Sequence, residues 1–328
     1  MSPESFTVPR WLRSAHLQTL GAALPLWTSF RTRPAELVRY PLPGGDGALH
    51  ARVWWQQEKA RTVVLVHGVG GTSESKYVLR AGVSLYRAGF HVIRLNLRGA
   101  GEGMIDAPSL YHGGLTEDLS VTVDALRSDP RVADIALVGF SLGGNASLKM
   151  AGEWGSSVPK GVRAVAALSA PLNLVEVSRA FERWRAYPYS RYVLRHLVAQ
   201  ATAFRRMHPA RANYALEDLR RLRTVRAYDE CVVAPMHGFD NALAYYRSAS
   251  CGPFLRRIEV PTLLVHAADD PMVPDFTVRP WLKELPRSVR VAWSEWGGHV
   301  GWFGGLTEDH WVETWAMRRV LRFLGEEC

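Results

Sequence analysis

The stretch that most constrains this chain is residues 134–149, DIALVGFSLGGNASLK. An apolar run leads into the pentapeptide GFSLG, which has Ser141 at its centre, and a helix-compatible run follows. This order predicts a buried strand, a sharp turn and a helix, with the serine at the apex of the turn. The two glycines suit a turn in which strand and helix approach too closely for a Cβ atom. We therefore predict that Ser141 has a strained backbone, projects above a sheet and acts as a nucleophile.

A serine hydroxyl is a weak nucleophile, so the chain should also supply a base and an acid that orients the base. Asp269 and Asp270 directly follow an apolar run at 262–266, and the carboxyl end of a strand is where parallel sheets build their sites. His299 follows the last apolar run, 289–293, and the glycines around it allow its loop to bend back over the sheet. We therefore predict His299 as the base and one of the two aspartates as its partner.

The oxyanion hole of such a site combines two backbone N–H groups, one from the residue after the serine and one from an earlier loop. These residues are predicted to be Leu142 and Val69, the latter in an HGVGG sequence that follows an apolar run. His67, in the same HGVGG sequence, is expected to order the loop by hydrogen bonding. His112 and His237 could approach the site, but a structural role is favoured for both.

Apolar runs alternate with helical patterns along most of the chain, which predicts an α/β fold, a mostly parallel sheet with helices on both faces. After Pro171 the alternation stops, and amphipathic sequence rich in arginine and aromatic residues predicts an inserted helical cap. The predicted parts are an N-terminal arm at 1–35, an α/β core at 36–171 and 236–328, and the cap at 172–235. Strands are expected at 37–42, 49–55, 62–66, 91–97, 135–138, 162–168, 262–266 and 289–293, and the last helix is expected as one piece over 308–323.

The net charge of +9 comes mostly from arginine and is concentrated in the predicted cap. Residues 172–235 hold twelve arginines, no lysine and six acidic residues, a local excess of +6. A solvated helical surface is the favoured interpretation of this pattern. The alternative is a surface that contacts anionic membrane lipid or an acidic substrate. No recognised nucleic-acid module accompanies the charge, so we expect no nucleic-acid partner.

The remaining composition favours a cofactor-free protein of the cytoplasm. The three cysteines, Cys231, Cys251 and Cys328, form no CxxC pair, which favours a reducing compartment and free thiols. No apolar run approaches the roughly 20 residues that cross a bilayer. There is no HExxH motif and no compact His/Asp cluster, so we expect no metal. The GAGEG run at 99–103 has the wrong glycine spacing for a dinucleotide loop, so we expect no cofactor.

Tryptophan offers a weaker signal about the substrate. The chain has twelve tryptophans, and most should lie in the core. Trp293, Trp296 and Trp302, however, bracket His299 in the sequence. Aromatic walls beside a nucleophile suit an apolar acyl chain, so we expect these three side chains to line the substrate site.

With these residues assembled, the chain resembles the YheT-like family of α/β-hydrolases nearly from end to end. The HLQT and YHGG blocks are distinctive of that family, whereas the GxSxG turn marks only the wider superfamily. The blocks that carry the resemblance are HLQTL at 16–20, LVHGVGGTSES from 65, NLRGAGEG from 96, YHGGLTEDL from 111, GFSLGGN from 139, MHGFDNALAYYR from 236, HAADDPMVP from 266 and GGHVGW from 297.

The resemblance implies an α/β-hydrolase fold and an esterase that acts on short- or medium-chain acyl esters. Members of the family include bacterial YheT, the yeast medium-chain fatty acid ethyl-ester synthases/esterases and mammalian lipases. The family's triad falls on Ser141, Asp270 and His299, and the DxxVP turn favours Asp270 over Asp269. Some relatives imply acyl transfer to an alcohol as the alternative. A non-catalytic binding module is disfavoured because all three triad positions are intact. The resemblance assigns no role to His16 or to His112.

Overall fold

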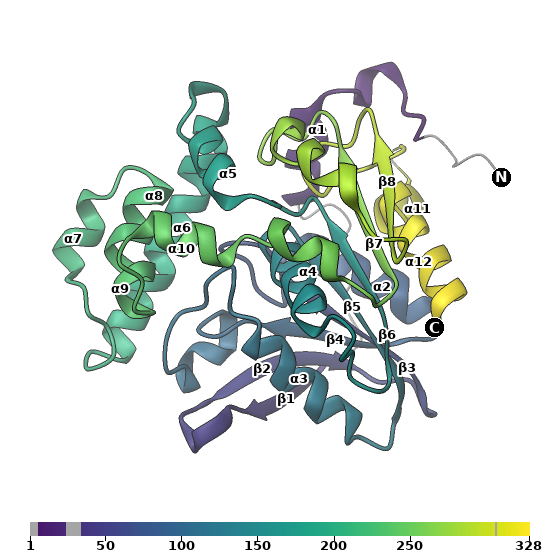
Figure 1. Cartoon of the computed structure of the whole chain (residues 1–328), viewed down its shortest axis with the longest axis horizontal. Coiled ribbons are helices and arrows are strands. Elements are labelled where there is room, and N and C mark those ends of the chain that lie inside the picture. Colours follow the sequence, from purple (N-terminus) through teal and green to yellow (C-terminus); the bar gives the residue numbers. More distant parts are fainter. Residues whose placement is uncertain (1–5, 24–33, 306) are drawn as a thin grey trace.

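The computed structural model describes residues 6–23, 34–305 and 307–328, and an eight-stranded sheet runs through its middle (Figure 1). The strand order is β1-β2-β4-β3-β5-β6-β7-β8. β2 pairs antiparallel with both β1 and β4, and the other neighbouring strands are parallel. The strands are β1 (Glu36–Pro41), β2 (Ala48–Trp54), β3 (Ala60–Val66), β4 (His91–Asn96), β5 (Val132–Phe140), β6 (Val162–Leu168), β7 (Thr262–Ala267) and β8 (Val289–Ser294).

Helices cover both faces of this sheet, as the continuous apolar runs predict. In β3, Val63 and Leu65 pack on the face covered by α2 and α12, whereas Val64 and Val66 pack on the face covered by α3 and α4. The alternation follows from the two-residue period of a strand. The predicted α/β fold, a mostly parallel sheet with helices on both faces, is therefore confirmed. The covering helices are α2 (Lys76–Arg87), α3 (Glu117–Arg127), α4 (Leu142–Trp154) and α12 (Trp315–Glu327).

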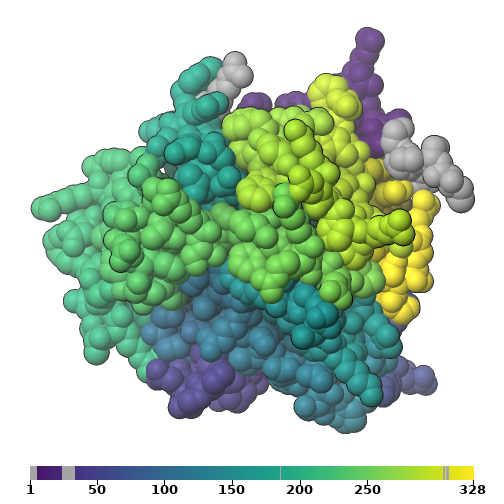
Figure 2. Space-filling view, in the orientation of Figure 1, coloured from purple at the N-terminus to yellow at the C-terminus, as the bar shows by residue number. Residues whose placement is uncertain are grey.

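Between β6 and β7 the chain forms a group of helices beside the sheet, at the left of Figure 1. These helices have a core of their own, with Phe204 and Val232 fully buried, and Figure 2 shows them packed against the rest of the molecule. The helices are α5 (Leu174–Phe181), α6 (Tyr187–Met207), α7 (Leu216–Arg221), α8 (Val225–Tyr228), α9 (Ala234–Met236) and α10 (Ala242–Ala249), with a π-helical turn at Asp229–Val233. The name cap is kept below for residues 172–235, whose boundaries stay a prediction.

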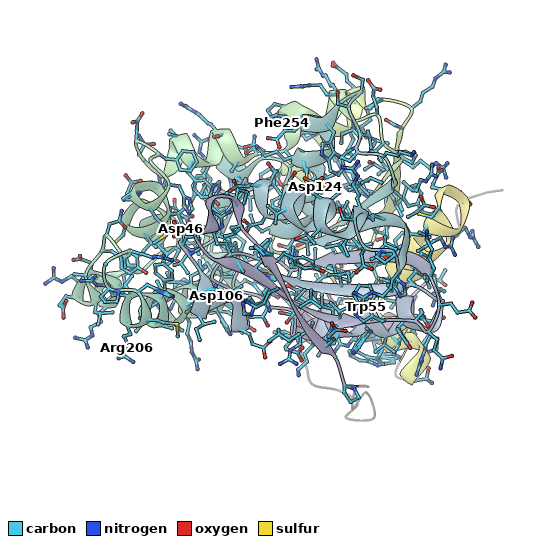
Figure 3. The ribbon with its side chains drawn as sticks, turned by 90° about the horizontal axis from the view of Figure 1, so that it is seen from below. Asp46, Trp55, Asp106, Asp124, Arg206 and Phe254 are labelled. Carbon is cyan, nitrogen blue, oxygen red and sulfur yellow. The ribbon has the colours of Figure 1, made fainter. Side chains whose placement is uncertain are left out.

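The cap also contacts the edge of the sheet that lies farthest from β8. Arg211 forms an ion pair of 3.0 Å with Asp46 in the β1–β2 hairpin, and it donates a hydrogen bond to the carbonyl of Ala107. Figure 3 shows Asp46 at the end of that hairpin beside the cap, and Arg206 at the cap's outer end. The cap is thus held by the antiparallel edge of the sheet as well as by its two connections to β6 and β7.

The predicted last helix is wrong in one respect, because the structure divides it into α11 (Glu308–Val312) and α12. Thr314 separates the two helices, and its hydroxyl accepts a hydrogen bond from the backbone N–H of Met317. A side chain that satisfies a free N–H of the first turn favours a new helix start at that point.

The predicted N-terminal arm is described only in part. It contains a 3₁₀ turn at Arg10–Leu12 and α1 (Ala15–Ala23). The rest of the predicted arm, residues 1–5 and 24–33, lies outside the described residues. Helix α1 is important for the site, because it packs against the loop that follows β8.

Candidate active site

Ser141 lies at the predicted sharp turn between β5 and α4. Its backbone has φ 50° and ψ −120°, a region that non-glycine residues rarely adopt. A Cβ atom at Gly139 would lie 2.4 Å from the carbonyl oxygen of Gly143, and one at Gly143 would lie 2.4 Å from that of Val66. Both glycines are therefore required by close packing of strand against helix, and the strained serine that they permit fits a nucleophile elbow.

The loop after β3 leaves one backbone N–H group near Ser141 without a partner. The N–H groups of Gly68 and Gly70 donate to the hydroxyls of Tyr77 and Tyr111, at 2.8 and 2.7 Å. The N–H of Val69, between them, has no hydrogen-bond partner among the described residues. An amide that faces a cavity while its neighbours are occupied is available to a substrate oxygen.

His67 holds this loop in the way the sequence predicts. Its Nδ1 lies 2.8 Å from the carbonyl oxygen of Gly68, and its Nε2 accepts a hydrogen bond from the N–H of Leu97. This pattern assigns the ring hydrogen to Nδ1. Burial lowers the pKa of His67 to about 4, so the ring is neutral at pH 7 and serves as a fixed hydrogen-bonded spacer.

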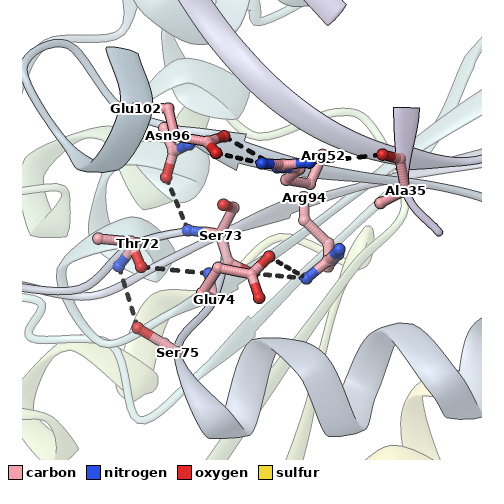
Figure 4. Close-up of polar contacts among 9 residues, drawn as sticks. All are labelled: Ala35, Arg52, Thr72, Ser73, Glu74, Ser75, Arg94, Asn96 and Glu102. Atoms are coloured by element: carbon pink, nitrogen blue, oxygen red, sulfur yellow. Dashed lines mark hydrogen bonds and ion pairs between the residues drawn. The ribbon is translucent and has the colours of Figure 1, made fainter. Parts of the chain in front are cut away.

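A polar network holds the next turn of the same loop, as Figure 4 shows. The N–H of Ser73 donates to Oδ1 of Asn96 at 2.7 Å, and Arg94 donates to the carbonyl oxygen of Ser73 and to Glu74. The Arg94 side chain is almost fully buried, and its guanidinium lies 4.2 Å from the centre of the Trp54 ring. A buried cation with these partners rigidifies the turn that leads from the Val69 loop into α2.

His299 and Asp270 contact each other as predicted. Nδ1 of His299 lies 2.8 Å from Oδ2 of Asp270, and both side chains are buried. Oδ1 of Asp270 accepts hydrogen bonds from the N–H groups of Met272 and Val273, at 2.8 and 2.9 Å. The turn after β7 thus holds Oδ1, and it leaves Oδ2 to accept from Nδ1 of His299, which fixes the tautomer and the orientation of the imidazole.

Asp269, the alternative acid, has a different contact. Its Oδ1 accepts a hydrogen bond of 2.8 Å from the N–H of Gly298, next to His299 in the chain. Burial, together with the charge of Asp270, raises the pKa of Asp269 to about 6. Asp269 therefore holds the backbone of the histidine loop, whereas Asp270 holds the ring.

Two hydrogen bonds at the end of β6 bring the serine and histidine segments together. The N–H of Ser141 donates to the carbonyl oxygen of Leu168 at 2.9 Å, and the next residue, Ser169, accepts a hydrogen bond of 3.2 Å on Oγ from the N–H of Val300. Val300 has φ 54°, a conformation that is costly for a β-branched residue. The histidine loop is thus strained at Val300, and it is bound by the residue after β6, next to the residue that binds the backbone of Ser141.

Helix α1 holds the same loop from the other side, and this contact could not be predicted. Oγ1 of Thr19 accepts a hydrogen bond of 2.9 Å from the N–H of His299. The Gln18 amide is fully buried, accepts a hydrogen bond from the N–H of Phe303 and donates one to the carbonyl oxygen of the same residue. Gln18 and Thr19 belong to the HLQT block, which is distinctive in the sequence and was the one sign that this segment has a role.

His16, in the same block, links α1 to the cap. Its Nδ1 lies 2.6 Å from the Tyr189 hydroxyl on α6.

A cavity of about 350 Å³ opens on Ser141, Val69 and Leu142, between the sheet and the cap. This volume is in the range of small-molecule sites. Most of its wall is apolar and comes from cap helices. The aliphatic and aromatic side chains that the cap contributes are Leu174, Val177, Phe181, Tyr187, Val193, Leu197, Val225, Tyr228 and Val233.

The prediction that Trp293, Trp296 and Trp302 line the substrate site is wrong, since none of them borders this cavity. Trp302 is fully buried beneath the histidine loop, where its indole N–H donates to Oγ of Ser294. Trp293 packs against the ring of His266. The reason is geometric, because Trp293 lies in β8 itself and the histidine loop turns the Trp302 ring into the core, so neither ring reaches the cavity. The cap supplies the apolar wall instead.

His112 and His237 pack against each other, with ring centres 4.5 Å apart. His112 borders the cavity and accepts a hydrogen bond from the N–H of Gly114, and Nε2 of His237 lies 2.8 Å from the carbonyl oxygen of Leu110. Burial, reinforced by His237, lowers the pKa of His112 to about 3. His112 is therefore a neutral group of the cavity wall and His237 packs against it, in line with the structural role favoured above.

Among the described residues there is no group of three or more His, Cys, Asp or Glu side chains that could hold a metal ion. No helix in the same residues is long and apolar enough to cross a membrane.

The sheet, the strained serine and the buried Asp–His pair define a chain of the α/β-hydrolase class. A comparison with family models agrees, since the model for the alpha/beta hydrolase fold matches residues 61–303. The chain belongs to the α/β hydrolase fold family.

Among curated proteins, the chain is similar to "Putative esterase YheT" of Escherichia coli, with 31% identity over 95% of this chain and 92% of that protein. It is also similar to a monoacylglycerol lipase of Saccharomyces cerevisiae, with 29% identity over 80% of this chain and 58% of that protein. The resemblance to YheT predicted from the sequence is thereby confirmed.

Solved structures support the fold alone, because their sequences are distant. The α/β hydrolase GrgF from Penicillium covers 90% of this chain and 99% of its own, with a TM-score of 0.61 and 15% identity. Est1E from Butyrivibrio proteoclasticus with bound ferulic acid covers 88% of this chain and 98% of its own, with a TM-score of 0.58 and 18% identity.

Proposed function

We propose that this protein is a serine carboxylic-ester hydrolase that acts on short- or medium-chain acyl esters. The observation that carries the proposal is the cavity, whose base holds Ser141 beside the unpaired N–H of Val69 and whose wall is an apolar surface from the cap. Relatives named as an esterase and a monoacylglycerol lipase support an ester substrate with an acyl chain.

In the proposed mechanism, Oγ of Ser141 attacks the ester carbonyl carbon while Nε2 of His299 accepts the hydroxyl proton. Asp270, bound to Nδ1, stabilises the imidazolium that forms. The N–H groups of Val69 and Leu142 bind the developing oxyanion. The carbonyl carbon–alkoxy oxygen bond then breaks, and His299 returns its proton to the leaving alcohol, which produces an acyl-enzyme. Water repeats the sequence, with His299 as its base, and releases the acid.

Ser141→Ala should abolish ester hydrolysis, since no other group replaces the nucleophile. A fluorophosphonate probe should label the wild type and not the variant, and rates over esters from acetate to palmitate should identify the preferred chain length. A matched control is Ser178→Ala. Ser178 borders the same cavity, but it lies within helix α5 and not at a sharp turn between a strand and a helix. Full hydrolysis by Ser141→Ala would contradict the mechanism.

Acyl transfer to an alcohol stays a prediction from the resemblance, because the same acyl-enzyme could be intercepted by an alcohol. Hydrolysis is preferred here because the similar proteins cited above are named an esterase and a lipase. Product analysis in ethanol–water mixtures separates the two. A cytoplasmic location also stays a prediction, and it rests on the three free cysteines.

The cap has a second surface that supports the predicted contact with anionic membrane. Trp184, Tyr187 and Tyr192 are 79%, 60% and 57% exposed, in a segment that also presents the exposed Arg191 and Arg195. Exposed aromatic rings among arginines suit the interface of an anionic bilayer.

The protein should therefore sediment with vesicles that contain anionic lipid more than with neutral vesicles, and Tyr192→Ser should weaken this binding several-fold. Leu37→Ser, which removes an exposed apolar side chain on β1, is the matched control and should bind like the wild type. Equal binding to neutral and anionic vesicles would refute the contribution of charge.

A further inference from the structure

One polar group in the cavity wall has no place in the proposed mechanism. Asp229 borders the cavity from the π-helical turn Asp229–Val233, which joins α8 to α9 in the cap (Figure 1). Only 7% of its surface is exposed. A π-helical turn widens the backbone spiral locally and is found frequently at functional sites. The carboxyl group thus lies in an otherwise mostly apolar wall.

The carboxyl group is only half satisfied by the protein. The hydroxyl of Tyr246 donates to Oδ2 of Asp229 at 2.5 Å. Oδ1 has no hydrogen-bond partner among the described residues. Oδ1 is not one of the fully buried unpaired atoms of the described residues, so it is open to the cavity and can accept a hydrogen bond from a water molecule or a ligand there.

The charges around the cavity decide which ligand group suits Asp229. Arg223, Arg226 and Glu182 border the same cavity, and the two arginines outnumber Glu182, which disfavours a cationic substrate group there. Burial raises the pKa of Asp229 to about 7, so both of its protonation states are populated near neutrality. An aliphatic hydroxyl both donates and accepts, so it can pair with either state.

We propose that Asp229, held by Tyr246, is a specificity-determining residue that binds an aliphatic hydroxyl of the ester substrate. The inference deepens the proposed function and rests on it. The hydroxyl could belong to the alcohol part, as in a glycerol ester, or to the acyl chain, and the experiment separates these two sources.

The test compares kcat/KM for two matched pairs of esters, measured by acid release. Glycerol monooctanoate against propyl octanoate tests the alcohol part, and ethyl ω-hydroxyoctanoate against ethyl octanoate tests the acyl chain. The wild type should prefer the hydroxylated ester in one pair by about tenfold or more, because the ester without the hydroxyl displaces water from the Asp229 carboxyl group and offers it no hydrogen bond. Equal rates within both pairs would overturn the inference without any variant.

Variants then test whether Asp229 causes the preference for the hydroxylated ester. Asp229→Leu should bring the ratio within about twofold of one, whereas Tyr246→Phe keeps the carboxylate and should retain the preference. Glu217→Gln, an exposed carboxylate on α7, is the control and should match the wild type. A preference that survives in Asp229→Leu overturns the inference. Failure of the proposed function gives a different result, namely hydrolysis that persists in Ser141→Ala.

Discussion

Replacing Asp270 with asparagine should lower kcat by about 10⁴-fold while the protein stays folded. The N–H groups of Met272 and Val273 both donate to Oδ1, so the amide oxygen must occupy that position. The amide NH₂ group then replaces Oδ2 and faces Nδ1 of His299, which now has to accept a hydrogen bond. The ring hydrogen moves to Nε2, and His299 can no longer take the proton of Ser141.

Asp269→Asn is the matched control for this experiment. Oδ1 of Asp269 accepts from the backbone N–H of Gly298, and an amide oxygen does the same. We expect a loss of less than about tenfold, since the variant does not alter the tautomer of His299. Both variants should be compared by kcat and by the rate of fluorophosphonate labelling. A loss in Asp269→Asn as large as that in Asp270→Asn would contradict the assignment of Asp270.

Gln18→Leu should destabilise the protein and also slow catalysis, although Gln18 lies 281 residues from His299 in the chain. The variant leaves the N–H and the carbonyl oxygen of Phe303 buried without partners, and each such group costs about 1–3 kcal/mol. The free energy of unfolding should therefore fall by about 2–6 kcal/mol.

The activity should fall because the same loop carries His299, whose N–H is held by the neighbouring Thr19. A displacement of roughly 1 Å in a catalytic group lowers the rate by about 10²-fold. Urea unfolding and kcat measured on the same samples check both effects. Gln57→Leu, an exposed glutamine in the loop between β2 and β3, should change stability by less than about 0.5 kcal/mol. Normal stability and activity in Gln18→Leu would refute the positioning role of α1.

The strands and the sharp turn were predictable because their signals are local. An uninterrupted apolar run such as that of β3 has one stable environment, a strand buried on both faces, and the structure begins this strand at Ala60, two residues before the prediction. The glycines at 139 and 143 indicate a close approach that no other residue allows. The order of Ser141, Asp270 and His299 along the chain was informative because each follows a strand of one sheet.

The tryptophan prediction was wrong because sequence proximity does not say which way a loop bends. Trp302 is three residues from His299, yet its ring lies in the core beneath the loop. The direction is imposed by Thr19 and Ser169, which bind the backbone on either side of the histidine side chain from α1 and from the end of β6. No local pattern records these partners.

The sequence by itself determined the α/β fold, the elbow at Ser141 and the candidates for base and acid, because apolar periodicity, glycine positions and chain order are properties of neighbouring residues. Only the tertiary structure decided which aspartate contacts the ring, that α1 holds the histidine loop, and that the cap forms the cavity wall with Asp229 in it. These are contacts between segments far apart in the chain, and they depend on how the cap and α1 pack against the sheet. That packing is set by the whole core at once and by no single stretch of residues.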